Sequence, residues 1–467
     1  MAISNLLLLS IVVAVLAVLF TTISSLPPHT HLIPANSLPP GPVWRAGFSL
    51  LSAIDGLLRL LTPPNLYLFK ELMGYLHTVE IYSAAELRLA DAIEEHTALY
   101  FPGGGATAAA GVPAHALALA LAPQCAAAAS GSPVECSAVA ARLSRLLRAT
   151  SAYGVFREHP QGSDAWLNTP ASAFLLEGHP ASLRPVALNF GRTQYAMMAR
   201  LPEAILGGQA AFAQVHGGEF WGWYDAHPSE HAIFDATMNA LGKLGAADAA
   251  IAQDVPWGTL ADAIVDVGGG TGEMAATILA AGAHPSPARA VIFDMPHVIA
   301  RSRAVWQEQQ LAPAANASNP LHALVAAHPS LPSRVSHAAG DMFDASTLPL
   351  PAPGSGERMA YLLRDILHDW PDADCVRILA ALRAAMVASG SGGRHRVMIV
   401  GRQIRPGAGF IQSLGTADAD MVMLGAFGTT AGERTLAQHV SLLEAAGLRL
   451  VKVTHTRSAY YVYEASI

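Results

Sequence analysis

Charge is scarce in this 467-residue chain, in which Asp, Glu, Lys and Arg make up 13% of the residues against 52% hydrophobic ones. The formal net charge is -7, and no run of Lys or Arg occurs. Nucleic-acid binders need concentrated positive charge to displace counterions from phosphates, so we expect no nucleic-acid partner. Cysteine is rarer still, because Cys125, Cys136 and Cys375 form no Cys-x-x-Cys pair. This pattern argues against a disulfide framework or a zinc site, and we expect no metal.

The first segment almost lacks polar residues. Ser10 is the only non-hydrophobic residue of residues 6–20, and apolar character extends over residues 3–26. About 20 apolar residues are what a helix needs to cross a bilayer. No basic residue precedes the segment and no small-residue cleavage site stands out, which favours an uncleaved anchor over a cleaved signal or transit sequence. We expect residues 1–26 to attach the chain to a membrane, with the rest facing the cytosol or an organelle interior. Without attachment the chain would be cytoplasmic.

Three further segments, which differ in composition, precede residue 256. Residues 27–66 are proline-rich and then helical, which indicates a tether and a linker helix interrupted at Pro63 and Pro64. Residues 67–184 contain an amphipathic helix at 137–150 followed by two short strands at 153–156 and 165–168, the outline of a winged helix. Residues 185–255 are helical and rich in aromatic residues and methionine, most of them core and some suited to lining an aromatic pocket.

Short apolar runs alternate with helical patterns over residues 256–467. This alternation predicts an α/β fold with a mainly parallel sheet, and the last two runs predict an antiparallel hairpin at its edge. The insertions at residues 312–326 and 351–356 are expected to be surface loops. The predicted strands lie at residues 263–267, 290–293, 335–337, 359–363, 397–400, 448–453 and 460–464.

A glycine loop follows the first of these strands, with Asp266 before it and Gly268 and Gly270 within it. Glycines let the backbone turn tightly and approach a ligand. The loop is not a dinucleotide fingerprint, because Glu273 stands at the third glycine position and would repel a pyrophosphate. S-adenosylmethionine carries no phosphate, and nearby carboxylates would favour its amino group and sulfonium.

Acids also end the second and third strands. Asp294 is placed to hold two ribose hydroxyls, and Asp341 to accept from an adenine amino group while Met342 lies on the ring face. Each acid alone would fit a helix cap, but three at neighbouring strand ends favour a cofactor site. His368 follows the fourth strand, where a histidine is suited to remove a proton from a phenol.

These motifs in this order resemble the plant caffeate-type and acetylserotonin-type O-methyltransferases and their bacterial small-molecule relatives. The resemblance covers residues 67–467. It implies a class I, Rossmann-like methyltransferase domain at 256–467, an acceptor pocket lined by 185–255, and a homodimer formed through 67–184. It also implies that His368 is the catalytic base, that Glu433 orients it, and that Arg364 replaces a cofactor-contacting lysine. The substrates would be S-adenosylmethionine and a small hydroxylated, aromatic acceptor.

One departure from that family concerns the fifth strand, which usually carries a second glutamate supporting the histidine. This chain has Gly401 and Arg402 there. An inward Arg402 would lower the basicity of His368, leaving Glu433 or Asp369 as its acidic partners. Two alternatives to methyl transfer therefore stay open. One is a homologue that binds the cofactor for another reaction, such as decarboxylation or hydroxylation, and the other is an inactive membrane-tethered binding protein.

Overall fold

The computed structural model describes residues 38–100, 111–122, 133–281, 287–311, 320–352, 354–390, 392–405, 415–428 and 431–467. The hydrophobic segment 1–26 and most of the tether lie outside these ranges. Within them, no helix combines the length and the apolar character needed to cross a bilayer.

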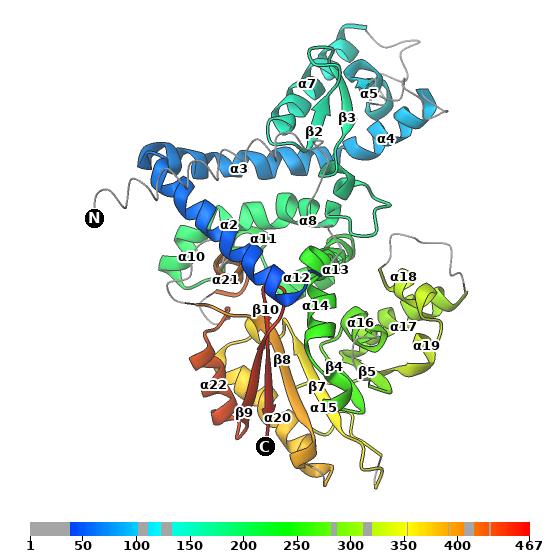
Figure 1. Ribbon diagram of the computed structural model, residues 1–467, viewed down its shortest axis with the longest axis vertical. Helices are drawn as coiled ribbons and strands as arrows, with labels where there is room; N and C mark the ends of the chain where they lie inside the picture. Colours follow the sequence, from blue (N-terminus) through cyan, green and yellow to red (C-terminus); the bar gives the residue numbers. More distant parts are fainter. Residues whose placement is uncertain are drawn as a thin grey trace.

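A seven-stranded sheet organises the C-terminal half (Figure 1). Its order is β6-β5-β4-β7-β8-β10-β9, with the first five parallel and β10 antiparallel to both of its neighbours. The predicted α/β class, the parallel sheet and the edge hairpin are therefore confirmed. The strands are β4 (Ala263–Val267), β5 (Arg289–Asp294), β6 (Val335–Ala339), β7 (Met359–Arg364), β8 (Arg396–Arg402), β9 (Arg449–His455) and β10 (Tyr460–Ser466).

Helices cover both faces of this sheet, because its central strands are apolar on both sides. Ile264 and Leu362 pack against one set of helices, and Val265 and Leu363 against the other. The first set comprises α14 (Ala247–Asp254), α15 (Trp257–Leu260), α16 (Glu273–Ala280), α17 (Pro296–Leu311), α18 (Pro320–Ala327) and α19 (Leu331–Arg334), and the second comprises α20 (Asp372–Ala388) and α22 (Leu436–Ala445).

The prediction that residues 312–326 form a surface loop was wrong for the second half of the insertion. Residues from Pro320 onward form helix α18. Leu321 and Val325, spaced four apart, lie in the core beside the sheet, and a proline at the first helical position favours this start. One helix ends at Leu61 and the next begins at Pro64, as the two prolines predicted. The first helix begins at Gly41, however, within the proline-rich part of residues 27–66 that was interpreted as a tether.

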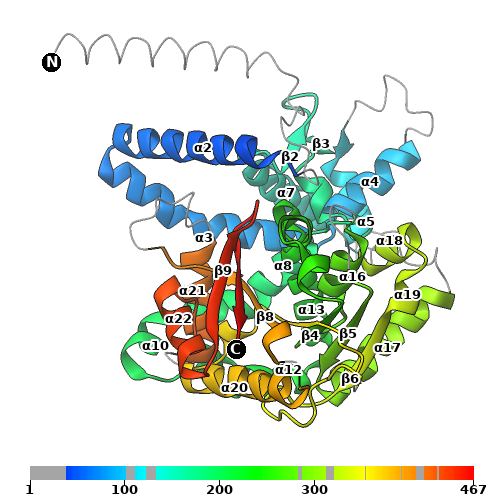
Figure 2. The same cartoon turned by 60° about the horizontal axis from the view of Figure 1, so that its bottom comes forward.

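A smaller unit of helices and a three-stranded antiparallel sheet of order β1-β3-β2 forms the N-terminal part. The long helix α3 packs against α4 and α7 of this unit, and at its N-terminal end it follows α2, as Figure 2 shows. Helix α7 and strand β3 match the helix and the second strand predicted there, whereas β2 begins only at the last residue of the first predicted strand, residues 153–156. The elements are α2 (Gly41–Leu61), α3 (Pro64–Glu86), α4 (Leu89–Tyr100), α5 (Ala114–Leu121), α7 (Pro133–Ser151), β1 (Val112–Pro113), β2 (Phe156–Glu158) and β3 (Ala165–Asn168).

Short helices form a layer between the N-terminal unit and the large sheet (Figure 1). Their core gathers Met197, Phe212 and Tyr224 together with Ala426 from a later helix, so chain segments far apart in sequence meet here. The elements are α8 (Arg184–Asn189), η3 (Phe190–Gln194), α9 (Tyr195–Met198), α10 (Leu201–Gly207), α11 (Ala211–His216), α12 (Phe220–Ala226), α13 (Pro228–Lys243) and α21 (Thr416–Phe427).

Candidate active site

The predicted site residues gather at the carboxyl edge of the large sheet, because parallel strands end on the same side. The glycine loop follows β4, Asp294 ends β5, Asp341 lies just beyond β6, and Arg364 ends β7. His368 follows β7 after a short connection.

The loop after β4 is shaped for close approach of backbone to a ligand. Gly268 has φ +71°, and a Cβ built there would lie 2.5 Å from the side chain of Ile366. Gly270 has φ +56°, and its N–H donates to Asp294 Oδ2 at 3.0 Å. Both positions have positive φ, and a side chain at Gly268 would also clash with Ile366. Glycine is therefore required at both. The hydrogen bond places the Asp294 carboxylate directly beside the loop.

Asp266 is the most buried of the three acids, with 3% of its surface exposed. Its Oδ2 has no hydrogen-bond partner among the described residues. Burial raises the pKa of Asp266 to about 7, while the positive charge of Arg364 acts in the opposite direction. A buried carboxylate with an unpaired oxygen is complementary to a cationic ligand group, so this residue fits the ammonium or sulfonium of S-adenosylmethionine.

Asp341 lies at the same edge but does not contact the other two acids. Its Oδ1 accepts the backbone N–H of Phe343, which fixes its own turn, and the preceding Gly340 N–H donates to the backbone oxygen of Asp294. Met342 is partly buried against the core on the α20 side of the sheet.

Arg364 is held by a residue that sequence reasoning missed. Its Nη2 lies 2.9 Å from Oδ1 of Asp248, which comes from helix α14. A Cβ on Gly242 would meet both partners, at 2.6 Å from Asp248 and 2.9 Å from Arg364. Burial raises the pKa of Asp248 and Arg364 opposes that shift. Nothing in the sequence around Asp248 distinguishes it from a surface acid of an alanine-rich helix.

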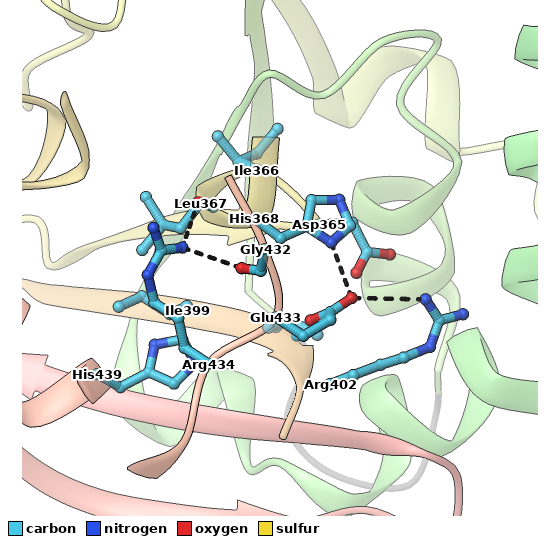
Figure 3. A pocket seen from close by; sticks show the side chains of 12 residues that line it. Asp365, Ile366, Leu367, His368, Ile399, Arg402, Gly432, Glu433, Arg434 and His439 are labelled. Atoms are coloured by element: carbon cyan, nitrogen blue, oxygen red, sulfur yellow. Dashed lines mark hydrogen bonds and ion pairs between the residues drawn. The ribbon is translucent and has the colours of Figure 1, made fainter. Parts of the chain in front are cut away.

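Carboxylates contact both ring nitrogens of His368. Nδ1 lies 3.0 Å from Glu433 Oε1, and Nε2 lies 3.3 Å from Asp369 Oδ1 (Figure 3 shows the Glu433 contact). Burial disfavours the charged imidazole, but the two carboxylates outweigh it and raise the pKa of His368 to about 10. Burial also raises the pKa of Asp369 to about 7. The imidazole of His368 is therefore a stronger base than that of a free histidine.

Arg402 points inward, with its Nη1 3.8 Å from Glu433 Oε1 (Figure 3). From the sequence, an Arg402 that points inward was expected to lower the basicity of His368. The net shift at His368 is nevertheless upward, because Asp369 and Glu433 are both closer to the imidazole.

Arg434 fixes the turn that carries His368, another role that sequence reasoning missed. It is 5% exposed, and its guanidinium donates to the backbone oxygens of Leu367 and Trp370 and to Asp372. Thr435 then caps helix α22 in a capping box with Gln438, which holds the segment carrying Glu433 and Arg434 in place. Residues 65 positions apart thereby meet as one site.

Many of the aromatic side chains in the intermediate helical layer pack on one another. Phe220 contacts the rings of Phe212, Tyr224, Phe234 and Phe427. This agrees with the prediction that most of them form core.

Comparison with known proteins places these features in context. The O-methyltransferase domain family matches residues 198–318 and 321–449. An O-methyltransferase of Streptomyces lavendulae is 31% identical over 328 residues, which cover 70% of this chain and 86% of that protein.

Solved structures also share the fold. The crystal structure of LaPhzM is similar with a TM-score of 0.66 at 25% identity, covering 87% of this chain and 99% of that one. A second structure, the O-methyltransferase NcsB1 from neocarzinostatin biosynthesis, was solved with S-adenosylmethionine and 2-hydroxy-5-methyl naphthoic acid. It is similar with a TM-score of 0.56 at 26% identity, covering 83% of this chain and 95% of that one.

Proposed function

The chain belongs to the O-methyltransferase family, and from this premise we propose that it methylates a hydroxyl group of a small aromatic acceptor with His368 as the base. S-adenosylmethionine is the methyl donor of this family, and it supplies an electrophilic methyl group on a positively charged sulfur. The membership confirms the resemblance found in the sequence. The roles of individual residues are part of the proposal.

The cofactor would be held at the carboxyl ends of β4, β5 and β6. The backbone of Gly268 and Gly270 allows its close approach, Asp294 binds the ribose hydroxyls, and Asp266 faces positive charge. Asp341 and Met342 hold the adenine. The unpaired buried oxygen of Asp266 and the position of Asp294 beside Gly270 N–H support this assignment. Arg364 lies at the same edge, and its ion pair with Asp248 fixes the position of its guanidinium.

His368 would take the proton of the acceptor hydroxyl on Nε2, because Nδ1 is engaged by Glu433. Asp369 now faces Nε2 at 3.3 Å and would yield this position to the hydroxyl. Glu433 then stabilises the resulting imidazolium. Alignment of the oxygen with the methyl group inside a closed pocket supplies the larger part of the acceleration.

The single observation that carries the base assignment is the pairing of His368 with a buried glutamate. Replacing His368 by Ala should lower kcat by about 100- to 10,000-fold, the usual contribution of general base catalysis. Transfer of radiolabelled methyl groups into a phenol library measures this, and His328→Ala, at an exposed position, is the matched control. Undiminished turnover of His368→Ala would refute the assignment. Cofactor binding without any labelled product would instead favour a different reaction or an inactive binding protein.

We also propose that the chain forms a homodimer through residues 67–184 and that residues 185–255 line the acceptor pocket. Apolar side chains exposed on α3 support it, with Phe69 and Leu72 60% and 62% exposed. Light scattering of the wild type and of a Phe69→Ser, Leu72→Ser variant tests it, and an unchanged dimer or a wild-type monomer would contradict it.

We also propose membrane attachment through residues 3–26, because almost all of these residues are apolar and a helix of about 20 apolar residues can cross a bilayer. Flotation of the full chain with vesicles, compared with a chain that starts at residue 38, tests it. Equal behaviour of the two would contradict it.

A further inference from the structure

Helix α21 holds the segment that carries Glu433, the carboxylate partner of His368. Oδ1 of Asp420, on this helix, accepts the backbone N–H of Glu433 at 2.8 Å, although the two residues are 13 positions apart. Within the described ranges this is the only hydrogen bond of the Asp420 side chain. A carboxylate acceptor makes such a bond stronger than one between two neutral groups. Asp420 therefore attaches Glu433 to an element outside the sheet.

Gly432 leaves the space that this contact needs. A Cβ built on Gly432 would lie 2.8 Å from Asp420 Oδ1, the oxygen that binds Glu433, so a side chain there would displace the carboxylate. The N–H of Gly432 itself donates to the backbone oxygen of His368 at 2.9 Å. The backbone that carries the Glu433 side chain is thus fixed to the His368 turn through Gly432 and to α21 through Asp420.

Helix α21 is a firm support for Asp420 because it packs against two parts of the fold. It contacts the turn that carries His368, Leu367–Asp369, and it also packs against α9, α10 and α11 of the intermediate helical layer (Figure 1). The second contact is close, since a Cβ on Gly425 would lie 3.1 Å from Cε of Met197. Precise placement of a catalytic group requires a rigid support of this kind.

We propose that Asp420 is a positioning residue of the catalytic pair, which holds the Glu433 backbone so that the Glu433 carboxylate stays within hydrogen-bonding distance of His368 Nδ1. This rests on the proposed function and adds to it a residue that acts through Glu433. The distance from Nδ1 to Oε1 is 3.0 Å, so a shift of the Glu433 backbone by roughly 1 Å would break the bond and lower the basicity of the imidazole. The role requires an accepting oxygen at Asp420 and not its charge.

The pKa of the His368 imidazole reports the position of Glu433 and needs no acceptor. It can be followed by NMR in full-length protein that carries ¹⁵N-labelled histidine and is loaded with S-adenosylhomocysteine, with His368→Ala to identify the resonance. Asp369 and Asp365 also raise this pKa, and both remain in every variant. Asp420→Ala should lower it by about one to two pH units, the equivalent of one charge-assisted hydrogen bond.

Four further proteins separate positioning from charge and from general damage. Asp420→Asn keeps the accepting oxygen, so the pKa of His368 should stay near the wild-type value. Gly432→Ala keeps Asp420 but displaces its carboxylate, so it should lower the pKa as Asp420→Ala does. Asp418→Ala, at an exposed position on the same helix, is the matched control and should change nothing. In a Glu433→Gln background, Asp420→Ala should lower the pKa much less than in the wild type, because the charge that it positions is gone.

A wild-type pKa of His368 in an Asp420→Ala protein that still binds S-adenosylhomocysteine overturns the proposal. An equal decrease in Asp420→Asn, or an undiminished decrease in the Glu433→Gln background, overturns it as well. If Asp420→Ala does not fold, Gly432→Ala decides in the same way.

Methyl transfer separates this proposal from the proposed function. Wild-type turnover of His368→Ala would remove the base and with it the role of Asp420. Lost turnover of His368→Ala, together with an unchanged pKa in Asp420→Ala, would refute the role of Asp420 alone.

Discussion

Glu433→Gln removes one negative charge from the histidine cluster while keeping the shape of the side chain. In the wild type, His368 must lose its proton before it accepts one from the acceptor, and the carboxylates raise its pKa to about 10. Turnover should therefore rise with pH through the neutral and mildly alkaline range. Without the Glu433 charge the pKa of His368 falls, so the rise should level off at a lower pH. The plateau should also be lower, because a less basic imidazole accepts a proton less readily.

The geometry sets the size of this effect. At the 3.0 Å separation of Nδ1 and Oε1, Coulomb's law with an effective dielectric constant near 20 gives about 5.5 kcal/mol as a ceiling. Two contacts reduce the loss. Asp369 still faces the other nitrogen at 3.3 Å, and the amide oxygen of glutamine still accepts from Nδ1. We expect about 1.5–3 kcal/mol to be lost, which corresponds to roughly a 10- to 100-fold lower plateau kcat.

The assay is kcat against pH for the wild type, Glu433→Gln and Glu444→Gln, the last an exposed glutamate on helix α22 that serves as the matched control. Affinity for S-adenosylhomocysteine should stay within about threefold in all three. A Glu433→Gln profile that levels off at the wild-type pH or above it, at full height, would refute the reasoning that this carboxylate acts through the histidine.

Three further outcomes follow from the same contacts. Gly268→Ala places a methyl group 2.5 Å from Ile366 at a positive φ, so unfolding by urea should show a loss of about 2–5 kcal/mol together with weaker cofactor binding; wild-type stability would contradict the close packing. The pKa of His368 is raised in the folded chain, so its stabilising contribution is complete below the unfolded value near 6.5 and is lost as pH rises through about 10. Melting temperatures of His368→Ala should thus fall less than those of the wild type between pH 7 and 10, and parallel curves would argue against the buried cluster. Arg434→Met leaves the backbone oxygens of Leu367 and Trp370 without this donor, so we expect a loss of about 3 kcal/mol and a lower kcat, whereas Arg377→Met, at an exposed side chain, should change neither.

The sheet could be predicted from the sequence because its strands are buried on both faces. Apolar runs such as residues 263–265 and 359–363 then stand out from the amphipathic helices between them. The end of each run also locates the site, since Asp294 and His368 lie at or just beyond strand ends. Helix α18 was missed because it is short and is preceded by a stretch of alanine and asparagine that has no helical period.

Pairings between distant segments were less accessible. The contact of His368 with Glu433 was expected only through resemblance to a family, since nothing in the local pattern relates residues 65 positions apart. Asp248 and Arg434 look like surface charges in the sequence. Their burial depends on how α14 and the segment before α22 pack against the β7 turn, which is a property of the folded chain.

Calorimetric titration with S-adenosylhomocysteine tests the central claim most directly, because the whole account depends on a cofactor site at the carboxyl edge of β4 and β5. The wild type should bind it with measurable heat, and Asp294→Asn, which loses the charge beside Gly270, should bind at least about tenfold more weakly. No heat with the folded wild type, or equal affinity in the two proteins, would contradict the account.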